Sequence, residues 1–189
     1  MAVDKLLSQI RKCEVCKSLL PMDPRPILNF SSKATIMITG QAPGIKAHES
    51  KTPWNDASGD RLRQWLGISK DEFYDPSKIA IVPMGFCYPG KGKSGDLPPR
   101  PECSEKWMEP IQTHLKKIEL HLLIGAYAIN YFLHEDDLTN TVRSWEKYYP
   151  HVIPLPHPSP RNNIWLKKNA WFEEELIPVL QKVIREKLR

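Results

Sequence analysis

Short apolar runs alternate with amphipathic stretches along this chain. Four of the runs are rich in aliphatic and β-branched residues and end at glycine or proline, as buried strands do; they span residues 34–39, 79–82, 120–124 and 151–155. The stretches between them space their apolar residues at helical intervals. Because strands that alternate with helices form parallel sheets covered on both faces, the pattern predicts an α/β protein. We expect a three-layer α/β/α sandwich with a central, mostly parallel four-stranded sheet.

Capping residues and prolines set the expected helix boundaries. Ser58 can cap a helix over residues 59–66, and Ser69 with Glu72 forms a capping box for the next helix. Further helices are expected, the last of them bent at Pro178, over residues 1–10, 104–117, 126–133, 138–148 and 169–187.

The composition is that of a globular protein rather than a disordered one. Hydrophobic residues make up 41% of the 189 residues and charged residues 26%, and this length suits one domain over residues 1–189. The longest apolar runs are too short to cross a bilayer, and the chain opens with an amphipathic helix in place of a signal sequence. We therefore expect a cytoplasmic monomer with no membrane partner.

The charge balance is modestly basic. Lysine and arginine exceed aspartate and glutamate by 27 to 22, which gives a formal net charge of +5. A positive field favours polyanions such as nucleic acid, although many basic proteins bind none. Charge alone therefore does not decide for a nucleic-acid partner.

Three unusual loops follow predicted strands. Residues 40–44 form a Gly-Gln-Ala-Pro-Gly turn, residues 83–90 are rich in proline and glycine, and residues 156–161 read Pro-His-Pro-Ser-Pro-Arg. Open parallel sheets bind ligands outside the carboxyl ends of their strands. We therefore expect the functional site at the edge of the sheet where these loops meet.

Three side chains in or near these loops suit chemistry at such an edge. His157, held between two prolines, can donate a hydrogen bond to a developing anion or be a surface histidine in a stiff turn. Trp54 is either a stacking plate for a planar ligand or a lid on the core. Arg161, followed by Lys167 and Lys168, can press into a nucleic-acid groove or belong to a solvated basic face.

The four cysteines carry a spacing that is typical of metal sites. Cys13 and Cys16 form a Cys-x-x-Cys pair after the first helix, and Cys87 and Cys103 flank a proline-rich loop. Four thiolates suit a tetrahedral zinc ion or a [4Fe–4S] cluster. The alternative is a set of four unrelated thiols.

The order and spacing of these motifs resemble the uracil-DNA glycosylase superfamily, most closely its iron–sulfur family 4. Residues 40–44 stand where that family has Gly-Glu-Ala-Pro-Gly, and Pro53-Trp54 stand where it has a Pro-Phe pair over the flipped base. Its second active-site motif begins His-Pro, as His157-Pro158 does. The longer string over residues 157–161 is similar to the intercalating loop of the single-strand-selective monofunctional branch.

The resemblance implies a monofunctional DNA glycosylase that flips out and excises a deaminated base, uracil first among candidates, from DNA containing a damaged base. It implies a [4Fe–4S] cluster, with zinc as the alternative. The residues implied are catalytic His157, Gln41 and His48; base-binding Gly40, Ala42, Trp54, Asp56 and Gly85; DNA-binding Pro158, Ser159 and Arg161; and the metal ligands Cys13, Cys16, Cys87 and Cys103.

Two departures from the family pattern matter for mechanism. Gln41 replaces a glutamate and Ala42 replaces the aspartate or asparagine of other branches, so the carboxylate that would activate water is missing. His48, Glu49 and Asp56 are the nearby substitutes.

The second departure lies in residues 82–86, which lack the asparagine that reads the edge of uracil in family 4. Three other functions therefore stay open. They are a glycosylase for another base such as hypoxanthine, a catalytically weak or inactive lesion-binding protein of the same fold, and a metal-bearing hydrolase of a small nucleoside.

Overall fold

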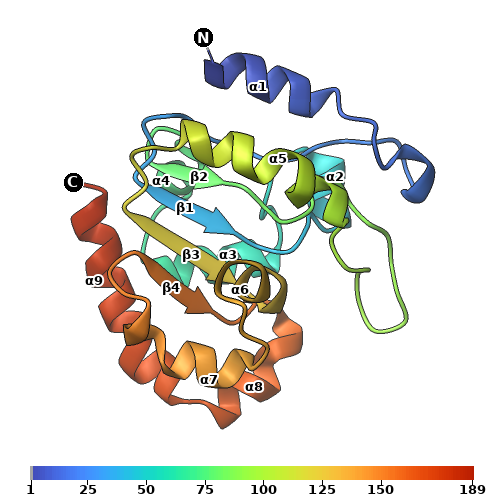
Figure 1. Ribbon diagram of the computed structural model, residues 1–189. Coiled ribbons are helices and arrows are strands. Elements are labelled where there is room, and N and C mark those ends of the chain that lie inside the picture. The colour runs from blue at the N-terminus through green and yellow to red at the C-terminus, as the bar shows by residue number, and fades with distance from the viewer. Residues whose placement is uncertain (1) are drawn as a thin grey trace.

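The computed structural model describes residues 2–189 and contains a central four-stranded sheet (Figure 1). The strands lie in the order β2-β1-β3-β4, and every neighbouring pair is parallel. The α/β class and the sheet are therefore confirmed. The strand bounds are β1 Ile36–Thr39, β2 Ile79–Ile81, β3 Leu120–Ile124 and β4 Val152–Leu155.

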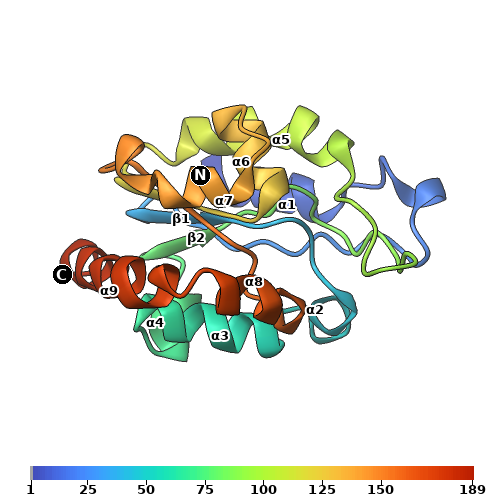
Figure 2. The same ribbon diagram turned by 90° about the horizontal axis from the view of Figure 1, so that it is seen from below.

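Helices cover both faces of the sheet and complete the three predicted layers (Figure 2). One face carries α1 Ala2–Arg11, α5 Pro101–His114, α6 Ala126–Leu133 and α7 Leu138–Arg143. The other carries α3 Ala57–Leu66, α4 Lys70–Tyr74, α8 Asn163–Lys168 and α9 Ile177–Lys187. A short helix, α2 Ile45–Ser50, follows the loop after β1.

Several expected helix boundaries hold, whereas the helix expected over residues 138–148 ends at Arg143 and the one expected over residues 104–117 ends at His114. The capping box of Ser69 and Glu72 is confirmed, whereas the cap of α3 is Asp56 and not Ser58, because the Asp56 carboxylate accepts the Gly59 N–H at 2.9 Å. Helix α5 begins at Pro101, since proline fits the first turn of a helix.

The last helix contains a π-helical turn just before Pro178. Residues 172–176 form a π-helical turn, and Pro178 then lies in the first turn of α9. Proline has no N–H for the carbonyl four residues earlier, so a wider turn is accommodated there. Helices α2 and α8 have six residues each, too few to give a periodic signal in the sequence.

The strands are mostly apolar because both faces of the sheet are covered, and Ile36, Ile38 and Leu122 are fully buried. Thr39 and His121 are polar exceptions within them. The Thr39 hydroxyl is fully buried and lies 2.8 Å from Nε2 of His121. Burial lowers the pKa of His121 to about 3, so this imidazole is neutral at physiological pH.

This neutral histidine predicts acid sensitivity of the fold. The folded-state pKa of about 3 lies below the value of about 6.5 in the unfolded chain. The unfolded chain therefore takes up the proton first, and the free energy of unfolding falls as the pH drops from about 6.5 toward 3, by up to about 1.4 kcal/mol per pH unit.

Urea unfolding at pH 7 and pH 5 measures this effect. Between pH 7 and pH 5, the free energy of unfolding of His121→Gln should fall by about 2 kcal/mol less than that of the wild type. This difference is expected whatever the stability of the variant at pH 7. If the free energy of unfolding falls by the same amount in the variant and in the wild type, other groups cause the acid sensitivity.

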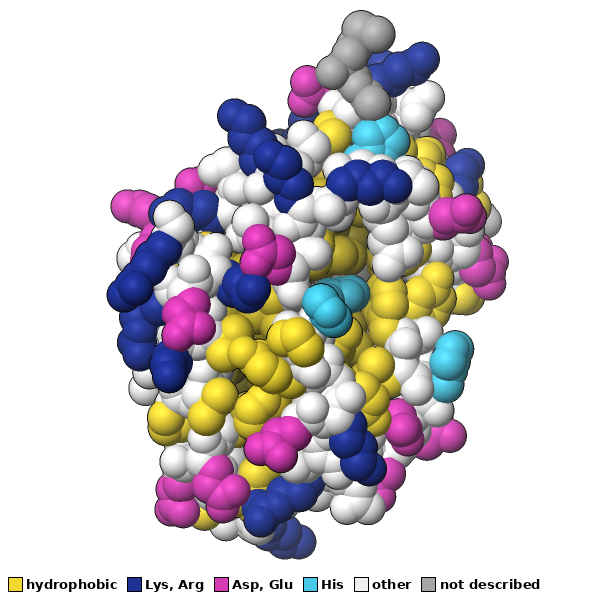
Figure 3. Space-filling view, turned by 60° about the vertical axis from the view of Figure 1, so that its left-hand side comes forward, with side chains coloured by type: hydrophobic (Ala, Val, Ile, Leu, Met, Phe, Trp, Pro, Cys, Tyr) yellow, Lys and Arg dark blue, Asp and Glu magenta, His cyan; other side chains and the backbone are white. Residues whose placement is uncertain are grey.

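No helix within the described residues is long and apolar enough to cross a membrane. Figure 3 shows the molecule from the side on which Figure 1 places the C-terminus. Basic and acidic side chains are interspersed on this face around hydrophobic side chains.

Candidate active site

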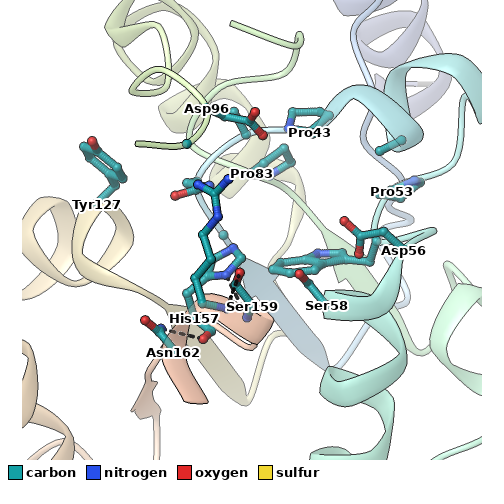
Figure 4. Close-up of a pocket in the computed structure, with 18 of the residues that line it drawn as sticks. Pro43, Pro53, Asp56, Ser58, Pro83, Asp96, Tyr127, His157, Ser159 and Asn162 are labelled. Atoms are coloured by element: carbon teal, nitrogen blue, oxygen red, sulfur yellow. Dashed lines mark hydrogen bonds between the residues drawn. The ribbon is translucent and has the colours of Figure 1, made fainter. Parts of the chain in front are cut away.

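A cavity of about 440 Å³ opens at the carboxyl ends of the strands (Figure 4). All strands end at the same edge because the sheet is parallel, and segments that follow each of them reach the cavity wall. The lining residues are Gly40, Gln41, Ala42, Pro43, Gly44, Ala47, Pro53, Trp54, Asp56, Ser58, Ile81, Pro83, Ser94, Gly95, Asp96, Tyr127, His157, Ser159, Arg161 and Asn162.

The loop after β1 is fixed against the loop after β2. The Gly40 carbonyl accepts the Met84 N–H at 2.9 Å, and the Gln41 carbonyl accepts the Gly85 N–H at 2.8 Å. A glycine is required at position 40, because a Cβ there would lie 2.6 Å from the ring of Trp54. The loop backbone is thus held rigidly beside an aromatic ring.

Trp54 is held in a left-handed backbone conformation, with φ of 56°. Two side chains behind it bind the carbonyls of this turn: the Tyr74 hydroxyl donates to Pro53 at 2.8 Å, and Arg63 donates to Trp54 at 3.3 Å. The Trp54 ring lies 5.6 Å from the His157 ring, between their centroids. Trp54 therefore lines the cavity and also packs against the core.

The orientation of His157 is fixed by its own loop. Its Nδ1 accepts the Ser159 N–H at 3.2 Å, and its carbonyl accepts the Asn162 side-chain amide at 2.7 Å. An Nδ1 that accepts a hydrogen bond places the ring proton on Nε2. Burial lowers the pKa of His157 to about 4, against the opposing effect of Asp56. His157 is therefore a neutral donor through Nε2.

The loop that carries His157 is tied to two other parts of the molecule. Arg61 of α3 donates to the Asn163 side chain at 2.9 Å and to the Ser159 carbonyl at 3.3 Å. On the other side, the Arg161 guanidinium donates to the Ser94 carbonyl at 2.6 Å. A Cβ at Gly95 would collide with that guanidinium. Arg161 thus connects the His157 loop to the segment over residues 91–96.

The structure brings most of the sequence-predicted residues into this cavity, but leaves others outside its wall. Gly85 lies behind the first loop, where a Cβ would meet Pro99. His48 is buried beside the Tyr88 ring, and its Nδ1 has no hydrogen-bond partner among the described residues. Pro158 is buried, and Glu49 is exposed on α2.

The lining residues that the sequence did not indicate as site residues include Pro83, Asp96 and Tyr127. Pro83 and Tyr127 directly follow strands or begin the next helix, so their places could have been inferred from the parallel topology. Figure 4 shows Asp96 beside Pro43, across the cavity from His157 and Asn162. No local pattern marks Asp96, because its place depends on how the segment over residues 91–96 folds back.

The cysteines line a second, much smaller pocket of about 10 Å³. Cys13 and Cys16 reach it from the segment after α1, Cys87 from the loop after β2, and Cys103 from α5. All four are free thiols. Burial raises the pKa of Cys87 to about 11 and that of Cys103 to about 12.

The donor set of this pocket fits a metal centre that binds through sulfur. Four thiols converge on one pocket that is otherwise walled by Leu20, Pro24, Pro26, Phe86 and Arg100. An apolar shell with one cation suits a buried anionic cluster. Within residues 2–189, however, no group of three His, Cys, Asp or Glu side chains is arranged so that it could hold a metal ion.

The site belongs to an α/β protein in which a neutral hydrogen-bond donor, His157, and an aromatic ring, Trp54, lie at the edge of a parallel sheet. Enzymes that act on a nucleobase require this combination. The model of the uracil DNA glycosylase superfamily matches residues 29–181, and the chain belongs to this superfamily. Its members are DNA glycosylases of base excision repair, and DNA is their substrate. The match includes Cys87 and Cys103, whereas Cys13 and Cys16 precede it.

Proposed function

We propose that this protein is a monofunctional DNA glycosylase that excises a deaminated base, uracil first, and that it is closest to the iron–sulfur family 4. The observation that carries the proposal is the state of His157. It is neutral, its proton is on Nε2, and it lies beside Trp54 in the cavity. A rigid neutral donor stabilises the anion that a departing base becomes.

The chemistry follows from this placement. An extruded base that stacks on Trp54 would present its carbonyl edge to the cavity wall. When the bond between the sugar and the base breaks, the electron pair leaves with the base. The Nε2–H of His157 would then donate to the carbonyl oxygen on which negative charge develops.

The monofunctional reaction is supported by the lining of the cavity. No lysine is among the described residues that line it, and a glycosylase that also cleaves the strand needs an amine nucleophile to form a Schiff base. We therefore expect water to be the nucleophile, and the product to be an intact strand with an abasic site.

Uracil is the base that we propose this cavity prefers. Pro83 stands at the exit of β2, where it offers no side-chain hydrogen bond, and the Asn162 amide is engaged with the His157 carbonyl. The base edge would then be read by backbone groups of residues 40–44 and by Gln41. Hypoxanthine, which presents a similar carbonyl and N–H, is the alternative base.

A second candidate function is a lesion-binding protein with little or no catalysis. Ala42 favours it, because the first loop supplies no carboxylate to activate water. The same cavity would then bind an extruded base without cleaving the glycosidic bond.

One experiment separates these functions. Oligonucleotides that carry uracil, hypoxanthine or another deaminated base, single-stranded and paired, are incubated with the protein, and abasic sites are revealed by alkaline cleavage. Excision of uracil supports the proposal. Excision of a different base alone shows that the protein is a glycosylase for that base and not for uracil. Tight lesion binding without excision establishes the second candidate, and competition by free nucleoside in place of DNA points to a nucleoside hydrolase.

Trp54 is expected to stack on the extruded base. Stacking on an aromatic side chain contributes about 1–3 kcal/mol per base, so Trp54→Ala should weaken binding of lesion DNA about tenfold or more, whereas Trp54→Phe should be mild. Binding is measured by fluorescence anisotropy beside a melting curve for each variant. If both variants lose the same affinity for lesion DNA and have lower melting temperatures, Trp54 stabilises the core and does not stack on the base.

Arg161 is expected to act on the duplex rather than in the chemical step. Only a duplex must be wedged open before a base can leave the stack. Arg161→Ala should therefore lower excision about tenfold or more on duplex DNA and only a few-fold on single strands. Lys167→Ala is the matched control, because an exposed lysine on phosphate should affect both substrates alike. If Arg161→Ala lowers excision equally on duplex and single-stranded DNA, Arg161 only contacts a phosphate.

The proposal includes a [4Fe–4S] cluster held by Cys13, Cys16, Cys87 and Cys103, with zinc as the alternative. The convergence of the four thiols on one pocket supports it. The cluster would supply structure and no reaction step, because all of its ligand positions would be filled by protein. It would join the segment after α1 to the loop after β2 and to α5.

A further inference from the structure

Hydrolysis needs a group that takes a proton from water, and the usual positions in this chain do not supply it. Ala42 has no functional group, and the amide of Gln41 cannot accept the proton. Of the substitutes suggested by the sequence, His48 and Glu49 lie outside the cavity wall, and Asp56 lies in it. The wall contains one further carboxylate, that of Asp96.

The two carboxylates differ in what they already bind. One oxygen of Asp56 accepts the Gly59 N–H at 2.9 Å and caps α3. The Asp96 side chain takes part in no hydrogen bond or ion pair formed within residues 2–189. Its Oδ2 lies 3.4 Å from where a Cβ on Gly44 would stand, so it faces the first loop directly. Asp96 thus has both carboxylate oxygens free to bind a water, whereas Asp56 has one oxygen engaged as a helix cap.

Asp96 stands on a tightly built segment, although the residue itself is exposed. Lys91 and Asp96 form an antiparallel bridge, and the Gly92 N–H donates to the Gly95 carbonyl at 2.6 Å. The Leu97 N–H donates to the Gly90 carbonyl at 2.8 Å. The Arg161 guanidinium also donates to the Ser94 carbonyl at 2.6 Å, while the backbone hydrogen bonds of the turn fix its shape.

We infer that Asp96 is the catalytic base that activates the water nucleophile. This inference rests on the proposed glycosylase function. Asp96 accepts one proton from a water molecule as the water oxygen bonds to C1′ of the sugar. The bond from C1′ to the base nitrogen breaks, and its electron pair leaves with the base as an anion, which accepts the Nε2–H hydrogen bond of His157. The base anion is protonated later by solvent, and Asp96 returns its proton to water.

The charges around Asp96 suit this role. Partial burial of its carboxyl group raises its pKa, and the Asp56 carboxylate raises it further, while Arg161 and Lys91 act in the opposite direction. The Tyr88 hydroxyl is the other titratable group that faces it, and Asp96 raises the pKa of that tyrosine. The net effect is a pKa above that of an ordinary aspartate, so the Asp96 carboxylate is a stronger base than a fully solvated one.

The test is the single-turnover excision rate of Asp96→Asn as a function of pH, on the base that the wild type excises best. A positioned general base contributes about 10²- to 10⁴-fold. We expect the excision rate of Asp96→Asn to be at least about 100-fold lower than that of the wild type, and its binding of lesion DNA to be at least as tight. The wild-type rate should decrease at acidic pH, and this decrease should be absent in Asp96→Asn. Asp71→Asn, an exposed aspartate on α4, is the matched control and should keep the wild-type rate.

Asp56→Asn distinguishes base catalysis from a general effect of negative charge. Asparagine also caps helices, so this variant removes one charge from the same cavity and keeps α3 intact. We expect it to retain the acidic fall in rate. An Asp96→Asn rate within about threefold of wild type would overturn the inference, as would a loss that leaves the pH profile unchanged. Absence of excision by the wild type on every base would instead refute the proposed function.

Discussion

Replacing His157 with alanine is expected to lower the rate of base excision about 10²- to 10³-fold while leaving the binding of lesion DNA within a few-fold of wild type. A donor aimed at developing negative charge acts mainly in the transition state. The His157 ring is already oriented by Ser159 and Asn162, so little reorganisation is needed when the base leaves. Single-turnover kinetics and anisotropy binding measure the two quantities separately.

The protonation state of His157 adds a second expectation to this experiment. Its pKa of about 4 keeps the imidazole neutral over the whole physiological range. The excision rate should therefore show no step near pH 6.5, where an ordinary histidine titrates. His157→Asn, which keeps an N–H donor, should recover part of the loss. Near wild-type excision by His157→Ala would remove the histidine from the mechanism.

The sheet and its layers could be predicted because the strands are buried on both faces. Such strands read as continuous apolar runs, and the run over residues 120–124 matches β3 residue for residue. The position of the site followed from one topological rule, since parallel strands end at the same edge. Trp54 and His157, which lie far apart in the sequence, are brought within 5.6 Å by that arrangement.

The differences between expectation and structure concern side chains whose direction depends on structure that has no local signal. His48 was a catalytic candidate because it lies close to the first loop, but the short helix α2 turns it into the protein, against Tyr88. Ser58 was expected to cap this helix, but the helix begins two residues earlier, at Ala57, and Asp56 caps it, since aspartate is also a capping residue. Asp96 was overlooked because only tertiary contacts bring residues 91–96 to Gly44 and Arg161.

Replacing any one of the four cysteines is expected to abolish metal binding and to lower the melting temperature by about 10 °C or more. Metal binding contributes directly to folding when the site does not exist in the unfolded chain. A loss of about 3–5 kcal/mol corresponds to about 10 °C in a protein of this size. Cys16→Ala and Cys103→Ala are suitable variants because their thiols reach the pocket from different segments, the turn after α1 and helix α5.

Val15→Ala is the matched control for these cysteine variants. It changes the same Cys-x-x-Cys turn, but Val15 is 52% exposed, so it should keep both the metal and the melting temperature. The proteins are purified without oxygen, and iron, sulfide and zinc per chain are measured together with the visible spectrum. Iron and sulfide in equal amounts with a brown colour identify the cluster, and one zinc per colourless chain identifies the alternative. A metal-free, fully folded wild type with four titratable thiols would show that the pocket holds only thiols, and the cysteine variants would then melt close to it.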